Sequence, residues 1–384
     1  MFSRVISAAV YGIDAYIVNV ETDVGFGLPT FDMSGALGSK VREAKDRVRV
    51  AIKNSGIELT PQKIVINISP ANIRKEGTIY DLPIAIGILA ANGCFDLKIL
   101  ENVLIIGEVS LDGSINPVKG VLPMVCAAKE AGIDNCIIPK ANIAEGRIMN
   151  NINIYGVETL SQTIEILKNI AVIDGSRKNI KQADVKSGEC NKSDGNINND
   201  TYNVLERSRV KFTYGSEVKN NNHSCSYNID YSDISGQEAA KRATMIAVSG
   251  MHNIMYIGPP GSGKTMLAQR IPTIMPDMDY EEQLRLTKIY SVAGLLDSDG
   301  GIMVKRPFRN PHHTITQAAL LGGGAVPRPG EITLSEGGVL FLDEMTEFNQ
   351  VIMEALRQPL EDKVITLVRV NACLLYTSPS PRDS

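Results

Sequence analysis

The chain has 384 residues, of which 43% are hydrophobic and 21% are charged, and its formal net charge is −4. This length exceeds one ordinary domain and the composition is that of a soluble globular protein, so two domains are expected. The slightly acidic balance excludes a general electrostatic attraction to nucleic acid, although a local basic surface stays possible.

Neither a disulfide framework nor a membrane span is indicated. The six cysteines are scattered without a C-x-x-C pair, which fits a reducing compartment. The most apolar run, residues 82–91, has about half of the roughly 20 residues that cross a bilayer, so it predicts a buried helix. Residues 1–7 lack the features of a signal peptide. We therefore expect a cytoplasmic protein with no membrane partner.

Residues 1–171 are predicted to form one α/β domain. The hydrophobic periodicity assigns its elements in chain order. Strands are expected at 4–10, 16–20, 63–68, 103–107 and 136–139, and helices at 39–53, 81–91, 124–131 and 159–169.

Residues 172–228 are dominated by Lys, Asn, Ser, Asp and Gly. Such a segment has too little apolar surface to offset the entropy lost on ordering. It is predicted to be a flexible linker, and a second domain is expected over residues 229–372.

The second domain contains a phosphate-binding loop. Residues 258–265 match G-x-x-x-x-G-K-[ST] at every position, between an apolar run at 253–257, predicted to be a buried strand, and a predicted helix. The glycines let successive backbone N–H groups face phosphate oxygens, and the lysine supplies a charge for the β- and γ-phosphates. The alternative is a glycine-rich turn that binds nothing. The predicted nucleotide-binding residues are Gly258, Pro259, Pro260, Gly261, Ser262, Gly263, Lys264, Thr265 and Met266.

A second motif, Gly-Val-Leu-Phe-Leu-Asp-Glu at residues 338–344, has the Walker B pattern. Its apolar run predicts a strand buried on both faces of a parallel sheet, with the two acids at its carboxyl end. Asp343 and the hydroxyl of Thr265 are predicted to hold Mg²⁺, and Glu344 to polarise the attacking water, with Lys264 as the second catalytic residue. The cofactors are therefore ATP and Mg²⁺. The alternative is two solvated acids that end a strand.

His312 and His313 raise the question of a metal site. Adjacent residues on an extended chain point to opposite sides, so they form a poor chelating pair. A structural or substrate-loop role is favoured over metal binding.

The first domain resembles the Lon-protease-like fold, which is also the fold of domain 2 of ribosomal protein S5. The resemblance rests on Lys75-Glu76-Gly77, on residues 106–113, on 127–132 and on 137–140. Active members use a Ser–Lys dyad, and by this alignment Ile79 and Leu122 occupy its two positions. Neither can act as nucleophile or base, so no protease activity is expected.

The second domain resembles the magnesium-chelatase-like AAA+ ATPases, and within them the YifB/ComM branch, which joins a Lon-like domain to this ATPase. The resemblance rests on residues 234–243, 306–314, 319–324 and 328–335, and it covers nearly the whole chain. It implies a phosphate-loop AAA+ α/β/α core with a parallel sheet, and it adds Ile234 and Gln237 to the nucleotide-binding residues. It further implies a homo-hexameric ring motor that acts on DNA in branch migration, competence or recombination. A chelatase motor subunit that drives metal insertion into a tetrapyrrole and a nucleotide-dependent scaffold stay open as alternatives.

The chain departs from this family after residue 372. The arginine finger, helical lid and sensor-2 arginine of the family are not in it, and residues 373–384 match no expected element and are interpreted as a non-native tail. Because arginine-finger chemistry stabilises the charge of the transition state, we expect this chain to bind nucleotide weakly and to hydrolyse it poorly.

Overall fold

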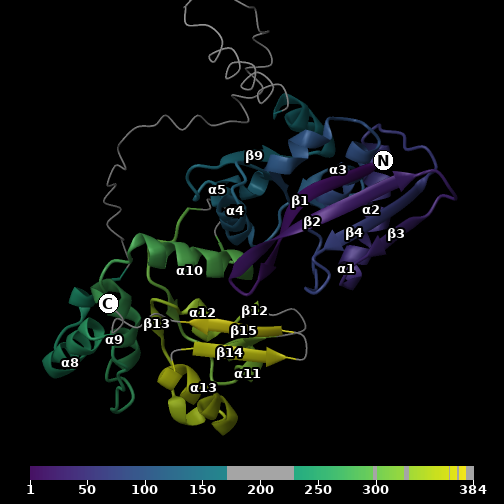
Figure 1. Ribbon diagram of the computed structural model, residues 1–384. Coiled ribbons are helices and arrows are strands. Elements are labelled where there is room, and N and C mark those ends of the chain that lie inside the picture. The colour runs from purple at the N-terminus through teal and green to yellow at the C-terminus, as the bar shows by residue number, and fades with distance from the viewer. Residues whose placement is uncertain (171–228, 297–300, 324–327, 363, 370–371, 378–384) are drawn as a thin grey trace, which may run out of the picture. The chain divides into compact units, whose positions relative to one another are not determined.

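A computed structural model describes residues 1–170, 229–296, 301–323, 328–362, 364–369 and 372–377 (Figure 1). The chain divides into two compact units. Unit 1 contains residues 1–10 and 14–214 together with 297–301, and unit 2 contains 11–13, 215–296 and 302–384. The predicted linker, 172–228, lies outside the described residues. No helix in the described ranges has the length and apolarity that crossing a membrane requires.

Unit 1 is built on a seven-stranded sheet with the order β3-β4-β2-β1-β5-β8-β9. β2 pairs antiparallel with β4, whereas the pairs β1–β5, β5–β8, β8–β9 and β3–β4 are parallel. The sheet is therefore mostly parallel, as the α/β fold class requires. Its strands are β1 (Phe2–Tyr11), β2 (Asp14–Gly25), β3 (Phe31–Ser34), β4 (Lys63–Ser69), β5 (Val103–Ile105), β8 (Asn135–Pro139) and β9 (Asn153–Val157).

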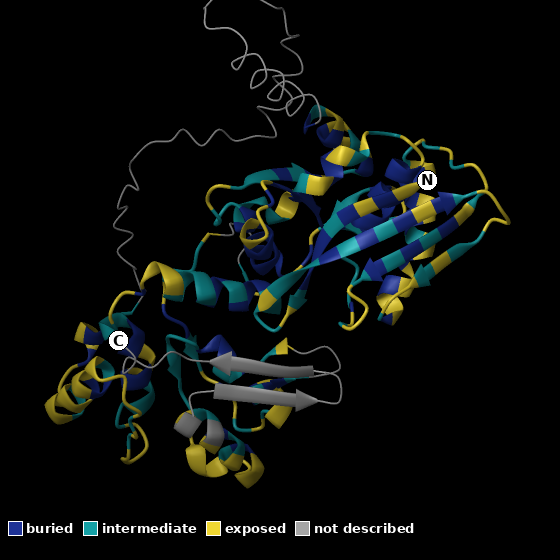
Figure 2. Ribbon diagram, in the orientation of Figure 1, coloured by how far each residue is buried: buried dark blue, intermediate teal, exposed yellow. Residues whose placement is uncertain are grey.

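Apolar residues cover both faces of the central strands. Successive side chains of a strand point to opposite faces, and in β5 Val103 and Ile105 join one core cluster while Leu104 joins another. The first cluster includes residues of α2 (Ala44–Asn54) and α3 (Asp81–Ala91), and the second includes residues of α4 (Val121–Glu130). Unit 1 is thus a three-layer α/β/α structure, with buried central strands visible in Figure 2.

α3 is the central helix of this unit. All of its residues are buried, as the uninterrupted apolar run predicts. The predicted helix at 39–53 is divided at Glu43 into α1 (Ser39–Arg42) and α2. The remaining elements of the unit are η1 (Leu97–Asn102), β6 (Glu108–Val109), β7 (Ile115–Asn116), η2 (Lys140–Asn142), α5 (Ile143–Gly146) and a helix at 160–170.

Unit 2 has short strands and small apolar clusters. One cluster joins η3 to α9, a second surrounds α10, and a third joins α11 to α13. Its helical elements are η3 (Tyr231–Asp233), α8 (Glu238–Ser249), α9 (Lys264–Arg270), η4 (Ile271–Ile274), α10 (Tyr280–Ala293), α11 (Gln317–Leu321), α12 (Glu331–Leu334), η5 (Met345–Glu347) and α13 (Gln350–Asp362). Its strands are β10 (Phe308–Arg309), β11 (Gly322–Gly323), β12 (Arg328–Pro329), β13 (Val339–Leu340), β14 (Val364–Arg369) and β15 (Ala372–Thr377).

The segment at 253–257, predicted to be a buried strand, is not a strand. Met255 and Ile257 are 64% and 90% exposed. An extended segment becomes a strand only when a neighbour accepts and donates its backbone hydrogen bonds, and among the described residues no strand pairs with this one. The apolar pattern shows that this segment could join a sheet. It does not show whether a neighbouring strand pairs with it.

The Walker B strand is only partly as predicted. β13 pairs with β10 in parallel, Phe308 opposite Val339 and Arg309 opposite Leu340. The expected burial on both faces is wrong, because residues 339–342 are half-buried and the described sheet has two strands. Residues 373–377, which belong to the tail interpreted as non-native, form β15 together with Ala372 and pair antiparallel with β14.

Candidate nucleotide-binding site

The phosphate-binding loop, residues 258–263, leads directly into α9. Gly261 and Gly263 have φ angles of +76° and +85°, in the left-handed region that glycine adopts without strain. At Gly258 a Cβ atom would lie 3.1 Å from the Ser262 hydroxyl oxygen. Backbone conformation therefore favours glycine at positions 261 and 263, and a side chain at position 258 would crowd the Ser262 hydroxyl.

Lys264 is the first residue of α9, and its side chain folds back over the loop. Its Nζ donates hydrogen bonds of 2.9 Å to the carbonyl oxygens of Gly258 and Pro259. These neutral acceptors are weaker partners for an ammonium group than a phosphate oxygen is. The positive charge therefore lies at the loop and is available to an anion.

Thr265 connects the loop to the Walker B motif. Its hydroxyl donates a hydrogen bond of 3.1 Å to Oδ2 of Asp343. The other carboxylate oxygen, Oδ1, accepts a hydrogen bond of 3.1 Å from the backbone N–H of Glu344. The structure thus brings together the two side chains predicted to bind Mg²⁺, and oxygen donors of this kind are the ligands that Mg²⁺ prefers.

Glu344 lies beside this pair with an exposed side chain. Its φ angle of +51° lies in the left-handed region, which a residue with a Cβ seldom enters. Such a conformation persists only where the surrounding structure enforces it, and it is common at functional sites. The backbone turns after Asp343. The Asp343 carboxylate is therefore hydrogen-bonded to Thr265, whereas the Glu344 side chain is exposed.

The β10–β13 pair supports the Walker B acids. The rings of Phe308 and Phe341 stack with centroids 5.9 Å apart, and the Phe341 N–H donates to the carbonyl of Arg309 at 2.8 Å. The Arg309 guanidinium donates two hydrogen bonds, of 2.6 and 2.7 Å, to the Glu331 carboxylate. These bonds raise the pKa of Arg309, so it stays charged.

Arg306 is buried and joins the turn before β13 to the start of α10. It donates to the backbone carbonyls of Pro276 and Gly337, and it forms an ion pair of 3.2 Å with Glu282. Sequence reasoning used Arg306 and Arg309 only as parts of a family motif. No local spacing identifies their partners, which lie 22 to 31 positions away.

Ile234 and Gln237 have different environments in the structure. Ile234 is buried in a cluster with Leu267 of α9, so it packs beneath the helix that follows the loop. Gln237 is exposed, with a φ angle of +55°, immediately before α8. Met266, which follows the phosphate-loop motif and is also predicted to bind the nucleotide, lies on α9 and is 39% exposed. Their contribution to nucleotide binding stays a prediction.

His312 and His313 do not point to opposite sides. Their rings lie next to each other with centroids 4.1 Å apart, because the chain turns here instead of continuing as an extended strand. The Nδ1 of His312 forms a hydrogen bond of 2.9 Å with the Thr314 hydroxyl. The backbone is not extended here, so the two histidines are not kept apart in the way that was expected to disfavour a metal site.

In unit 1, the two residues that the resemblance aligns with the Ser–Lys dyad, Ile79 and Leu122, have apolar environments. Leu122 is fully buried, Ile79 packs against the core, and both carry hydrocarbon side chains without a nucleophile or base. The nearby Lys75 is also buried, and its Nζ donates to the carbonyl of Pro70. Burial lowers the pKa of Lys75.

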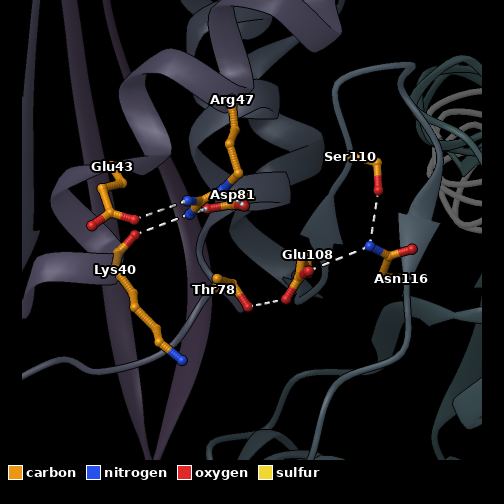
Figure 3. A network of polar contacts seen from close by, with 8 residues as sticks. All are labelled: Lys40, Glu43, Arg47, Thr78, Asp81, Glu108, Ser110 and Asn116. Atoms are coloured by element: carbon orange, nitrogen blue, oxygen red, sulfur yellow. Dashed lines mark hydrogen bonds and ion pairs between the residues drawn. The ribbon is translucent and has the colours of Figure 1, made fainter.

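A polar network surrounds the start of α3 (Figure 3). Asp81 is fully buried, and both of its oxygens accept hydrogen bonds from Arg47, at 2.8 and 2.9 Å. Burial raises the pKa of Asp81, and these hydrogen bonds act in the opposite direction. Beside this pair, Glu108 accepts hydrogen bonds from Thr78 and Asn116. These contacts satisfy buried polar groups and hold the helix start in place.

Two family profiles match the chain. The profile described as magnesium chelatase, subunit ChlI, matches residues 230–380, and that of subunit ChlI of Mg-chelatase matches residues 20–142.

Individual relatives extend these matches over nearly the whole sequence. The competence protein ComM of Haemophilus influenzae is 36% identical over 97% of this chain and 66% of its own length. The uncharacterized protein YifB of Escherichia coli is 37% identical over 97% of this chain and 65% of its own length. The archaeal Lon protease of Thermococcus kodakarensis is 31% identical over 38% of this chain and 23% of its own length. The chain spans about two thirds of the length of ComM and YifB.

A Lon-like α/β unit joined to a phosphate loop and a Walker B motif defines a protein of the AAA+ class. More narrowly, the chain belongs to the magnesium-chelatase ChlI family, in the branch that includes ComM and YifB. Members of this class use a nucleotide and Mg²⁺ in general.

Proposed function

We propose that this protein is an ATP-binding and ATP-hydrolysing ring motor that depends on Mg²⁺. The observation that carries the proposal is the hydrogen bond between the Thr265 hydroxyl and the Asp343 carboxylate, 3.1 Å long. It places the oxygen atoms of two separate motifs side by side, next to a lysine that lies over a glycine-rich loop.

Each residue has a defined task in this proposal. The backbone N–H groups of the loop and Lys264 bind the β- and γ-phosphates, and Thr265 and Asp343 hold Mg²⁺ directly or through water. Mg²⁺ supplies charge neutralisation at the phosphates when it is bound. Glu344 takes up the proton of the attacking water. Ile234 and Gln237 are assigned to the nucleotide as well, Ile234 by supporting α9 from below.

We further propose DNA as the polymer on which the motor acts. Support comes from the likeness to the competence protein ComM, which covers 97% of this chain. The working form is proposed to be a cytoplasmic homo-hexamer, because ring motors of this class place a residue of one subunit at the nucleotide of the next.

A chelatase motor subunit is the second candidate, since the family profile of the second unit carries that description. The Lon-like unit argues for the first candidate, because the relatives that match along the whole chain include ComM and YifB and combine both units.

ATP turnover with different partners separates these functions. Stimulation by forked or single-stranded DNA is expected if the motor acts on DNA. Stimulation only by a chelatase partner with a porphyrin would instead support the chelatase motor subunit, which drives metal insertion. ATP binding without turnover, in a form of the protein that includes the arginine finger of the family, would indicate a nucleotide-dependent scaffold.

A further inference from the structure

A mixed nitrogen and oxygen cluster lies next to the Walker B acids. His313, Glu344 and Glu347 each have one potential ligand atom, and these three atoms lie within 4.8 Å of one another. The residues come from two segments: His313 lies in the turn after β10, and Glu344 and Glu347 are the N-cap and the last residue of η5. Only folding brings them together.

The separation of two of these groups is longer than a usual hydrogen bond and is compatible with an ion pair or with a shared metal. The His313 Nδ1 is 3.5 Å from Glu347 Oε2, and an N–H···O bond is usually about 2.7–3.2 Å long. Two ligands of a tetrahedral metal with bonds of about 2.0–2.1 Å lie roughly 3.3–3.4 Å apart. The three candidate ligand atoms lie within 4.8 Å of one another, so the side chains would have to move closer together to reach this spacing.

Packing orients the histidine while solvent still reaches the cluster. The His313 ring lies 4.1 Å from the His312 ring and meets Phe348 edge-on at 6.5 Å. The side chains of His313 and Glu347 are 29% and 54% exposed. The ring is therefore held by aromatic contacts, and a water molecule can complete a fourth coordination position.

We propose that His313, Glu344 and Glu347 form a binding site for a divalent transition metal of the Zn²⁺ class. One imidazole and two carboxylates suit zinc, whereas Mg²⁺ prefers an all-oxygen set such as Thr265 and Asp343. The site shares Glu344 with the proposed ATPase centre. A metal bound there occupies the carboxylate that would take up the proton of the attacking water, so zinc inhibits hydrolysis without displacing ATP. This regulatory part rests on the proposed function, and the metal site does not.

Zinc binding is measured by isothermal titration calorimetry without nucleotide, on the unsubstituted chain and on His313→Ala and Glu347→Gln. The six cysteines also attract zinc, so the difference between variants is the relevant quantity. Both substitutions change partly exposed side chains, and each is expected to weaken one binding event at least about tenfold. His252→Ala, at an exposed histidine elsewhere in unit 2, serves as the matched control and should bind as the unsubstituted chain does. Equal affinity and stoichiometry in His313→Ala would overturn the site.

The inhibitory role is tested by ATP turnover at increasing zinc concentration with Mg²⁺ in excess. Turnover should fall with zinc in the unsubstituted protein and resist it in His313→Ala. Equal inhibition of both proteins would overturn the regulatory role. A form of the protein that includes the arginine finger of the family, binds zinc at this site and hydrolyses no ATP would refute the proposed ATPase function while the metal site stands, because calorimetry detects the site independently of turnover.

Discussion

The Thr265 hydroxyl and the Asp343 carboxylate lie 3.1 Å apart, although 78 positions separate the two residues in the sequence. The hydrogen bond joins the first turn of α9 to the end of the Walker B motif. Two candidate Mg²⁺ ligands are therefore positioned by the folded chain itself. This arrangement lowers the reorganisation that metal binding requires.

Thr265→Val should remove the Mg²⁺-dependent part of nucleotide binding. The substitution preserves the branched shape and deletes the hydroxyl, and loss of a hydrogen bond to a charged group costs about 1.5–3 kcal/mol, roughly a 10- to 100-fold loss of affinity. Titration with a fluorescent ATP analogue, with and without Mg²⁺, measures the effect. Thr265→Ser keeps the hydroxyl and should bind nearly normally. A Thr265→Val protein that keeps its full response to Mg²⁺ would exclude Thr265 as a ligand.

Lys264→Ala should abolish nucleotide binding and leave the fold intact. In the part of the chain that the structure describes, the Nζ donates its hydrogen bonds to carbonyl oxygens of its own loop, so its loss removes no described interaction between elements. Calorimetric titration with ATP measures binding, and circular dichroism checks the fold. Lys241→Ala, on α8, where the lysine pairs with Glu238, provides the control. Unchanged ATP affinity in Lys264→Ala would disprove the role of the loop lysine.

In a form of the protein that includes the arginine finger of the family, Glu344→Gln should retain ATP binding and lose turnover. The amide has nearly the same shape as the carboxylate but cannot accept the proton of water, and removing a general base typically slows a reaction about 10²- to 10⁴-fold. Steady-state phosphate release and ATP binding are measured on the same preparation. Loss of binding together with turnover would show that Glu344 has a structural role instead.

Arg47→Leu should destabilise unit 1 by about 3–5 kcal/mol, because it leaves the buried Asp81 carboxylate without its cation. The double variant Arg47→Leu/Asp81→Leu removes both charges and should recover most of this loss. Urea unfolding of the two variants and the unsubstituted protein gives the comparison. Equal destabilisation of the single and double variants would contradict the argument.

The same pair predicts a pH dependence. Burial raises the folded-state pKa of Asp81 above its ordinary value of 3.8, so the folded chain binds this proton more readily than the unfolded chain does. The resulting stability is fully present below that ordinary value and is lost as the pH rises through the folded-state pKa. Arg47→Leu removes the hydrogen bonds that oppose the shift. Its destabilisation should therefore be smaller at about pH 5 than at about pH 7.5, and equal destabilisation at both would argue against a buried charged Asp81.

Local patterns predicted a large part of the structure. The helix at 81–91 was identified to the residue, because an uninterrupted apolar run of this length can only be buried. The phosphate loop was found because its φ angles and its lysine restrict the residue types allowed at each position. Strands β3 and β9 were missed, since they are short and the hydrogen bonds that define them come from neighbouring strands.

The errors concern pairing and direction. The segment at 253–257 has a strand pattern without a described partner strand, and residues 339–342 are half-buried where two covering layers were expected. The two adjacent histidines were placed on opposite sides by assuming an extended backbone, whereas the chain turns at this point. In each case the prediction assumed a paired strand or an extended backbone. Whether a segment has a pairing strand or turns depends on neighbouring segments that its own sequence does not specify.

By itself, the sequence determined the two motifs and the α/β character of the chain, because each depends on residue types within a few positions. Only the tertiary structure decided which distant groups meet: Thr265 with Asp343, Arg47 with Asp81, and His313 with Glu344 and Glu347. These contacts depend on how helices and strands pack across tens of residues. The distance between two side chains that are far apart in the sequence depends on how the whole backbone packs. The spacing of residues within one segment does not specify that packing.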